Sequence, residues 1–82
     1  MLTIKILGPG CANCQKLAQI AAEAAEQLGI PFEIVKVTKM DEIMRYDILR
    51  TPGLVINEQL VCSGRIPTTN TVAAWLQEAR SD

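Results

Sequence analysis

Apolar and polar residues alternate in the first segment of the chain and then change period. In LTIKIL, residues 2–7, the apolar positions are separated by Thr3 and Lys5, and this period of two predicts a β-strand. After GPG the period becomes helical, and the polar residues mark the opposite face. The apolar positions of this second segment are Cys14, Leu17, Ala21, Ala24 and Leu28. The pattern therefore predicts an amphipathic helix from residue 11 to residue 28.

The end of this helix is marked by two residues. Gly29 stands where a terminating glycine is expected, and Pro31 prevents the helix from continuing. Residues 32–37 are rich in β-branched side chains, which predicts a buried strand. A strand–helix–strand unit of this length favours two parallel strands joined by a right-handed crossover.

The next part of the chain predicts a short helix and a hairpin. Apolar residues recur at helical spacing over residues 40–46, with two acids in the first turn, where the helix dipole favours negative charge. Two short strands, residues 54–56 and 59–63, flank Asn57 and Glu58, which predicts an antiparallel hairpin. Asn57 can adopt a positive φ, whereas Glu58 is a poor turn residue.

A last helix is predicted at the end of the chain. Thr68 or Thr69 can cap it, and its apolar face consists of Val72, Trp75, Leu76 and Ala79. The order of elements is then βαβαββα, and we expect one domain over residues 1–82.

Composition and charge exclude several classes of partner. The chain has 82 residues, is 49% hydrophobic and carries a net charge of −1 without any run of like charge. It therefore lacks the basic surface that nucleic acid or an anionic membrane requires, and we expect proteins or small thiols as partners. Residues 1–7 contain no signal-peptide pattern, and no segment is long and apolar enough to span a membrane. We expect a cytoplasmic monomer.

The cysteines limit the kind of site. Cys11 and Cys14 lie three apart, a third cysteine is Cys62, and histidine is absent. This composition excludes a mixed cysteine–histidine zinc site, and a four-cysteine site needs one more thiolate than a monomer has. A reducing compartment argues against a purely structural disulfide. An exchangeable disulfide and a clasp for a soft metal ion remain.

Three motifs in order resemble the thioredoxin-like superfamily, and most closely the small glutaredoxin-sized redox proteins of archaea and bacteria with a GxGCxxC motif. They are KILGPGCANCQKL, RTPGLVIN and VCSGRIPT. The resemblance implies a thioredoxin/glutaredoxin-like α/β fold, βαβαββα, with a four-stranded mixed sheet of order 2-1-3-4 flanked by three helices. The first and third helices would cover one face and the second helix the other. It also implies a thiol–disulfide oxidoreductase without a cofactor, which acts on disulfide-containing proteins or small thiols and is served by an unidentified reductase.

The two cysteines are predicted to divide the chemistry. At a helix start, residues i and i+3 lie roughly 5 Å apart, so a disulfide can close without backbone movement. Cys11 lies at the helix N-terminus, where the dipole stabilises a thiolate, and is the predicted nucleophile. Cys14 lies on the apolar stripe and is the predicted resolving thiol. Gly8 and Gly10 would allow a partner to approach the backbone.

The resemblance also assigns a substrate-binding edge. In the superfamily the proline that opens the third strand lies against the cysteine pair, often after a cis peptide bond, and here it is Pro52 after Thr51. Since proline has no N–H, the Thr51 backbone would be free to pair with an extended peptide, and Gly64 would flank the same groove. Lys5 falls where thioredoxins carry a buried acid.

Two further readings complete the sequence-based expectations. Cys62 alternates with Leu60 on a strand and is predicted to pack in the core. The alternative function is a heavy-metal-binding module that holds a soft ion such as Cu(I) through Cys11 and Cys14. Such modules run βαββαβ and end on a strand, whereas this chain is predicted to end on a helix. A zinc site shared by two chains ranks lowest, and we expect no metal.

Overall fold

The computed structural model describes residues 2–8, 10, 12–46, 48 and 50–80. The elements follow the predicted βαβαββα order: β1 (Leu2–Leu7), α1 (Ala12–Leu28), β2 (Phe32–Val37), α2 (Met40–Met44), β3 (Gly53–Ile56), β4 (Gln59–Ser63) and α3 (Thr69–Arg80). No helix among these residues is long and apolar enough to cross a membrane.

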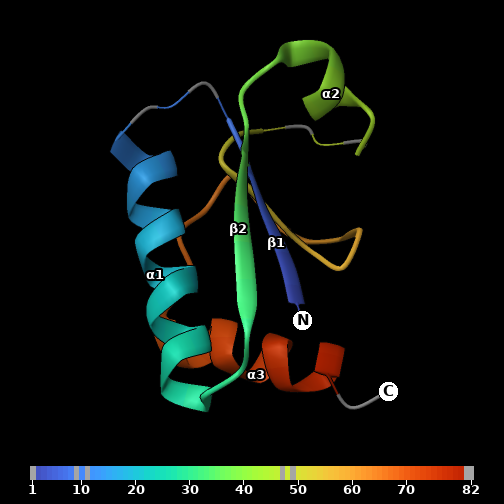
Figure 1. Ribbon diagram of the computed structural model, residues 1–82. Helices are drawn as coiled ribbons and strands as arrows, with labels where there is room; N and C mark the ends of the chain where they lie inside the picture. The colour runs from blue at the N-terminus through green and yellow to red at the C-terminus, as the bar shows by residue number, and fades with distance from the viewer. Residues whose placement is uncertain (1, 9, 11, 47, 49, 81–82) are drawn as a thin grey trace.

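The strands form one four-stranded mixed sheet of order β2-β1-β3-β4. β1 pairs in parallel with β2, and β3 is antiparallel to both β1 and β4. Figure 1 shows β1 and β2 side by side, with α1 packed along them. The predicted fold class and strand order are confirmed.

The end of α1 has the capping geometry that its sequence predicts. Gly29 has φ 66°, its N–H donates to the Glu26 carbonyl at 3.0 Å, and the Ile30 N–H donates to the Ala25 carbonyl at 3.3 Å. These two bonds are those of a Schellman motif, which requires the left-handed conformation that glycine adopts without strain. The chain therefore reverses after Leu28 and enters β2.

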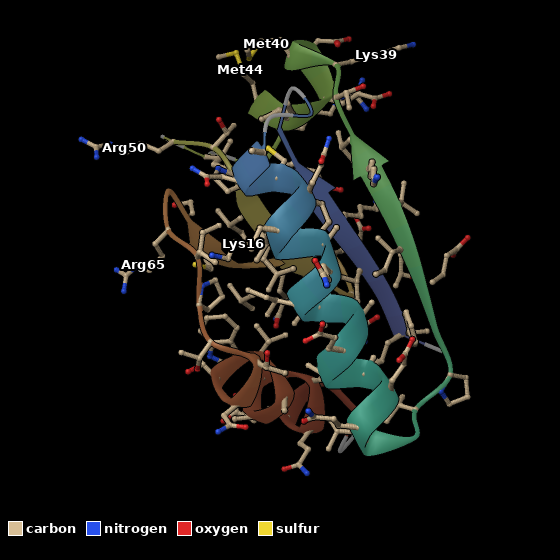
Figure 2. All side chains as sticks on the ribbon, turned by 90° about the vertical axis from the view of Figure 1, so that its left-hand side faces the viewer. Lys16, Lys39, Met40, Met44, Arg50 and Arg65 are labelled. Atoms are coloured by element: carbon tan, nitrogen blue, oxygen red, sulfur yellow. The ribbon has the colours of Figure 1, made fainter. Side chains whose placement is uncertain are left out.

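One face of the sheet is covered by α1 and α3, which also pack against each other (Figure 2). The main core lies there, and Leu17, Ala21, Val72 and Leu76 are fully buried in it. The N-cap of α3 is Thr68, whose Oγ1 accepts the Thr71 N–H at 3.2 Å. Trp75, predicted to be core, is only half-buried at the edge of this cluster.

Among the described residues, the other face is covered by α2 and by Tyr46 and Ile48, which follow it. Its core consists of Leu7, Val37, Ile43 and Val55. The prediction that this helix reaches residue 46 was too long, because α2 ends at Met44. The N–H groups of Arg45 and Tyr46 donate, both at 3.2 Å, to carbonyls three residues earlier, so the last turn tightens and the α-helix stops.

The β3–β4 turn is fastened to β1, which explains its unusual residue. Asn57 and Glu58 have φ 49° and 70°, the pair of positive angles that a two-residue hairpin turn requires. The Asn57 side-chain Oδ1 accepts the Thr3 N–H at 3.1 Å. The Glu58 carboxylate forms an ion pair with Lys5 and accepts a hydrogen bond from the Tyr46 hydroxyl at 3.2 Å. These tertiary contacts favour Glu58 at a position where it is otherwise a poor choice.

A bulge changes the orientation of β4. Val55 pairs with Leu60 but Leu54 pairs with Cys62, so Val61 is an extra residue. Leu60 therefore packs on the α2 side of the sheet, while Cys62 joins the core under α1 and α3. The prediction that Leu60 and Cys62 alternate regularly, and so share a face, was wrong, because an extra residue reverses the side to which later side chains point.

Candidate functional site

Cys14 and Thr51 meet around Gly8, at the end of β1. Cys14 lies in the first turn of α1 and is 5% exposed. A Cβ at Gly8 would collide with Cys14 Sγ and would lie 3.7 Å from Thr51 Cβ. Gly8 is itself buried, so its missing side chain makes room for the Cys14 thiol. The expectation that Gly8 serves the approach of a partner stays a prediction.

The predicted partner of Cys14 in the CxxC motif is not among the residues that the structure describes. Cys11, the predicted nucleophile, and Pro9 lie outside the described residues. Gly10 is exposed with φ 90°, a conformation that favours glycine. α1 begins at Ala12, so residues 12–14 of the CxxC motif lie in its first turn.

The predicted substrate-binding residues converge on the same edge of the sheet. The Thr51–Pro52 peptide bond is cis, as predicted. Thr51 is exposed and Pro52 buried, and the Pro52 carbonyl accepts the Gly64 N–H at 2.9 Å. Gly64 has φ 73°, and a Cβ there would lie 2.9 Å from Arg50 Cβ. The loop before β3 and the loop after β4 are thus held together beside Gly8.

A small hollow of about 60 Å³ opens next to Cys14. It is lined by Ile6, Gly8, Gly10, Cys14, Gln15, Lys36 and Thr38. Lys36 and Thr38 come from the end of β2 and were not predicted as site residues. Their position in the chain carried the signal, because β1 and β2 are parallel and the carboxyl ends of parallel strands meet at one edge of the sheet.

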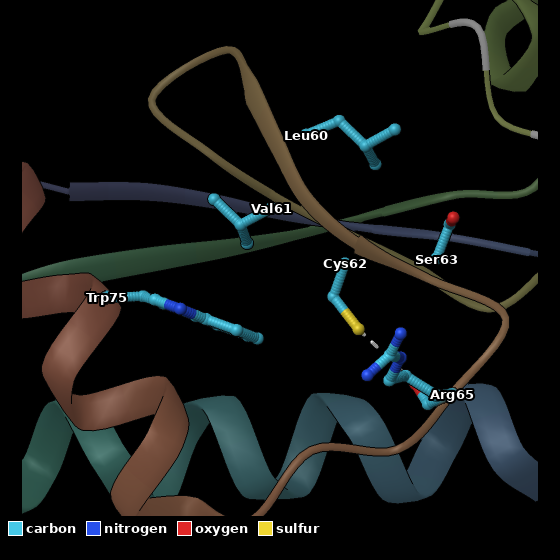
Figure 3. Close-up of a pocket in the computed structure, with 6 residues that line it drawn as sticks. All are labelled: Leu60, Val61, Cys62, Ser63, Arg65 and Trp75. Atoms are coloured by element: carbon cyan, nitrogen blue, oxygen red, sulfur yellow. Dashed lines mark hydrogen bonds between the residues drawn. The ribbon is translucent and has the colours of Figure 1, made fainter.

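Cys62 lies in a different environment from Cys14. It is a free thiol, 8% exposed, and packs in the main core as predicted. Its Sγ donates to the Arg65 carbonyl at 3.7 Å, and burial raises the pKa of the Cys62 thiol above its ordinary value. Figure 3 shows Cys62 facing Arg65 at a surface hollow that Trp75 also lines. These contacts indicate packing more than reactivity.

Lys5, at the position of the superfamily's buried acid, is engaged on the α2 side of the sheet. Its Nζ donates to the Tyr46 hydroxyl at 2.9 Å and pairs with the Glu58 carboxylate. The Glu58 carboxylate and then the Tyr46 hydroxyl hold the pKa of Lys5 well above its usual range. The cluster of Lys5, Tyr46 and Glu58 therefore fastens the end of α2 and the β3–β4 turn to β1.

Comparisons with known proteins identify the family. The family model described as a thioredoxin domain matches residues 2–77. A thioredoxin of Methanothermobacter thermautotrophicus is 39% identical over 72 residues, which are 88% of this chain and 94% of that protein. A thioredoxin of Methanocaldococcus jannaschii is 38% identical over 77 residues, 94% of this chain and 88% of that protein.

Solved structures agree on the fold. Thioredoxin-2 of the malaria parasite, a component of its protein secretion machinery, has a TM-score of 0.67 at 13% identity, covering 95% of this chain and 82% of its own. An identity this low supports the fold alone. The matched domain and the two archaeal relatives show that the chain belongs to the thioredoxin family and is a thioredoxin-like oxidoreductase of the thiol–disulfide type.

Proposed function

We propose that this chain reduces disulfides of protein substrates, and of small thiols, through the dithiol of Cys11 and Cys14. The Cys11 thiolate attacks one sulfur of the substrate disulfide, which forms a mixed disulfide and releases one substrate thiolate. The Cys14 thiolate then attacks the Cys11 sulfur, which releases the second substrate thiol and leaves a Cys11–Cys14 disulfide. Two electrons pass to the substrate, and a thiol-dependent reductase returns the pair to the dithiol.

The observation that carries this proposal is the burial of Cys14 against Gly8 beside Thr51. A shielded thiol in the first turn of a helix suits a resolving role, because it meets the mixed disulfide from inside the protein and competes poorly for an external substrate. We propose Cys11 as the attacking thiol of the pair, since in the chain it directly precedes Ala12, the first residue of α1, and a helix N-terminus stabilises a thiolate.

We also propose that the substrate lies as an extended segment along Thr51 and Pro52. Thr51 is exposed and neighbours Gly8, whereas the Pro52 carbonyl is already occupied by the Gly64 N–H. An added strand at this edge would use main-chain hydrogen bonds for affinity. We propose that the protein acts as a monomer in the cytoplasm, where reductases keep such dithiols reduced.

Trapping experiments test the division of roles. Cys14→Ser should accumulate a mixed disulfide through Cys11 when offered a protein disulfide, because nothing resolves the intermediate. Cys11→Ser should show little reaction, and Cys62→Ser is the matched control, which should keep turnover with dithiothreitol as reductant. Peptide mapping by mass spectrometry locates the linkage. A mixed disulfide at residue 14 in Cys11→Ser, formed as fast as in Cys14→Ser, would reverse the assignment.

Metal analysis tests the alternative function. The proposal predicts no stoichiometric metal after purification in reducing, metal-free buffer, and a reversible intramolecular disulfide on mild oxidation. One copper or zinc ion per chain, without such a disulfide, would instead support a soft-metal module that uses Cys11 and Cys14 as ligands.

A further inference from the structure

A groove of about 450 Å³ lies between α2 and the segment that leads to Pro52. We call it the methionine groove, and the described residues that line it are Met40, Ile43, Met44, Ile48, Arg50 and Thr51. Met40 and Met44 are 62% and 65% exposed, and they are the exposed large hydrophobic residues of the described part of the chain. Four residues apart on one helix, they share a face. Exposed apolar side chains that gather at one place mark an interaction surface.

The methionine groove is continuous with the thiol site. Thr51 lines the groove, and it is also the residue whose Cβ lies beside Gly8 and hence beside Cys14. A protein that presents a disulfide to this edge of the sheet would therefore cover the groove at the same time. The groove is thus placed to contact the residues that surround the partner's cysteine.

The charged side chain that lines the groove is positive. It is that of Arg50, whose aliphatic stem packs over Gly64. Figure 2 shows Arg50 extending into solvent below Met40 and Met44, whereas Lys39 extends to the opposite side of the molecule. Within the described residues Arg50 forms no ion pair.

Carboxylates are absent from the groove as far as the described residues show. Glu42 of α2 lines a different hollow, together with Lys5, Arg45 and Tyr46. Arg50 thus places a positive charge at the groove on a chain of net charge −1. Charge complementarity then favours an acidic partner, because matched potentials steer encounter and suppress wrong partners.

We infer that the methionine groove docks the disulfide-bearing protein partner through an apolar side chain flanked by carboxylates near the partner's cysteine. This inference rests on the proposed function and names the partner's chemistry. Methionine side chains are flexible and polarisable, so Met40 and Met44 adapt to different apolar residues. Arg50 then supplies the charge selection.

Three model peptides test the inference. Each carries one cysteine as its 2-pyridyl disulfide, flanked on both sides by Leu with Glu, by Leu with Lys, or by Ser alone. Attack by the reduced protein releases 2-thiopyridone and forms a mixed disulfide, which Cys14 resolves to the free peptide thiol. The release is followed by absorbance, and each rate is divided by that of the same peptide with dithiothreitol, which removes differences in intrinsic reactivity.

We expect the Leu-Glu peptide to react about tenfold faster than the Leu-Lys peptide at low salt. This ratio should fall toward one at about 1 M salt, where the Debye length is about 3 Å. Paired Met40→Ser and Met44→Ser substitutions should slow the Leu-Glu peptide about fivefold, and Arg50→Gln about threefold. Arg45→Gln, an equal loss of charge on the side of the other hollow, is the matched control and should leave the rate unchanged.

Two further measurements separate the inference from the proposed function. Pyridyl disulfide of 2-mercaptoethanol reports exchange without docking, so its failure to react would contradict the proposed function alone. Serine analogues of the peptides report docking without exchange: the methyl NMR signals of Met40 and Met44 should shift with the Leu-Glu analogue and not with the Leu-Lys analogue. Equal normalised rates and equal shifts for all peptides would overturn the inference. So would methionine substitutions that change self-association in sedimentation and leave the peptide rates as they were.

Discussion

The two faces of the sheet are built differently. Among the described residues, a cluster of thirteen buried residues, from Leu2 to Leu76, lies under α1 and α3, with alanines on α1 that let the helix approach the strands. Of the same described residues, only four form the buried cluster under α2, namely Leu7, Val37, Ile43 and Val55. The first face is closed by long helices, and the second is closed in part by the polar cluster of Lys5, Tyr46 and Glu58.

This difference suits the two faces of the sheet to different roles: the face under α1 and α3 to stability and, as we propose, the face under α2 to recognition of partners. A five-residue helix covers little of a sheet, so Met40 and Met44 remain exposed and a groove opens beside Thr51. The thiol of Cys14 lies between the two regions, buried in the large core but next to Gly8 at its edge. The face under α2 can therefore present a surface to partners, while the larger core under α1 and α3 stabilises the fold.

The largest effect on the free energy of unfolding should come from a cavity in the core under α1 and α3. Leu17→Ala should lower the free energy of unfolding by about 3–4 kcal/mol, because Leu17 is fully buried between α1 and the sheet. Ile43→Ala, the equivalent change under α2, should cost about 2 kcal/mol, since a short helix can settle into the space. Urea unfolding followed by Trp75 fluorescence measures both. Equal costs would contradict the division between the faces, and Gln27→Ala on the exposed side of α1 is the control.

The junction between the faces is probed by Gly8→Ala. The added methyl group meets Cys14 Sγ, and we expect a cost of about 1–3 kcal/mol with a disulfide-reduction rate about tenfold lower. Gly29→Ala is the matched control: nothing lies within 4 Å of its added Cβ, and only its φ of 66° is strained. It should cost about 1 kcal/mol and leave the rate unchanged. A normal rate in folded Gly8→Ala would show that Cys14 does not depend on this contact.

The second buried cysteine sharpens the contrast with Cys14. Cys62→Ala should cost about 1 kcal/mol and retain disulfide reduction, because Cys62 contributes packing. Because the pKa of Cys62 is raised in the native protein, its alkylation by iodoacetamide should require a higher pH than that of an ordinary thiol, whose pKa is about 8.5. Unfolding in urea should remove this requirement for a higher pH. Rapid alkylation of native Cys62 at neutral pH would contradict its assignment to the core.

The smallest effect on stability should come from the polar cluster of Lys5, Tyr46 and Glu58, on the face covered by α2. The hydrogen bond from Lys5 is the main cause that lowers the pKa of Glu58 in the folded protein. A lowered pKa stabilises the fold above the unfolded value of about 4.3, and this stabilisation is lost as pH falls through the folded value. The difference in urea midpoint between the wild type and Glu58→Gln should therefore be constant above about pH 5 and shrink below about pH 4. Glu33→Gln, which removes an exposed carboxylate on β2, is the control of equal charge change.

Local pattern was sufficient for the order of elements. The period along β1, the glycine that ends α1 and the threonine that caps α3 act within a few residues, so their outcome is readable from neighbours in the chain. The motif around Thr51 and Pro52 predicted the cis bond through resemblance to a family. Cys11 remains a prediction, because it lies outside the described residues.

What the tertiary structure decided depends on residues far apart in the chain. Gly8 had to be glycine because the Cys14 thiol fills the space of its side chain, and Glu58 suits its turn because Lys5, on the neighbouring strand β1, binds its carboxylate. The bulge at Val61 moved Leu60 and Cys62 to opposite faces through pairing with β3. The sequence alone determined periods, caps and motifs, since these are set by local backbone geometry. Which side chains share a space was decided only by packing, since no period along the chain encodes it.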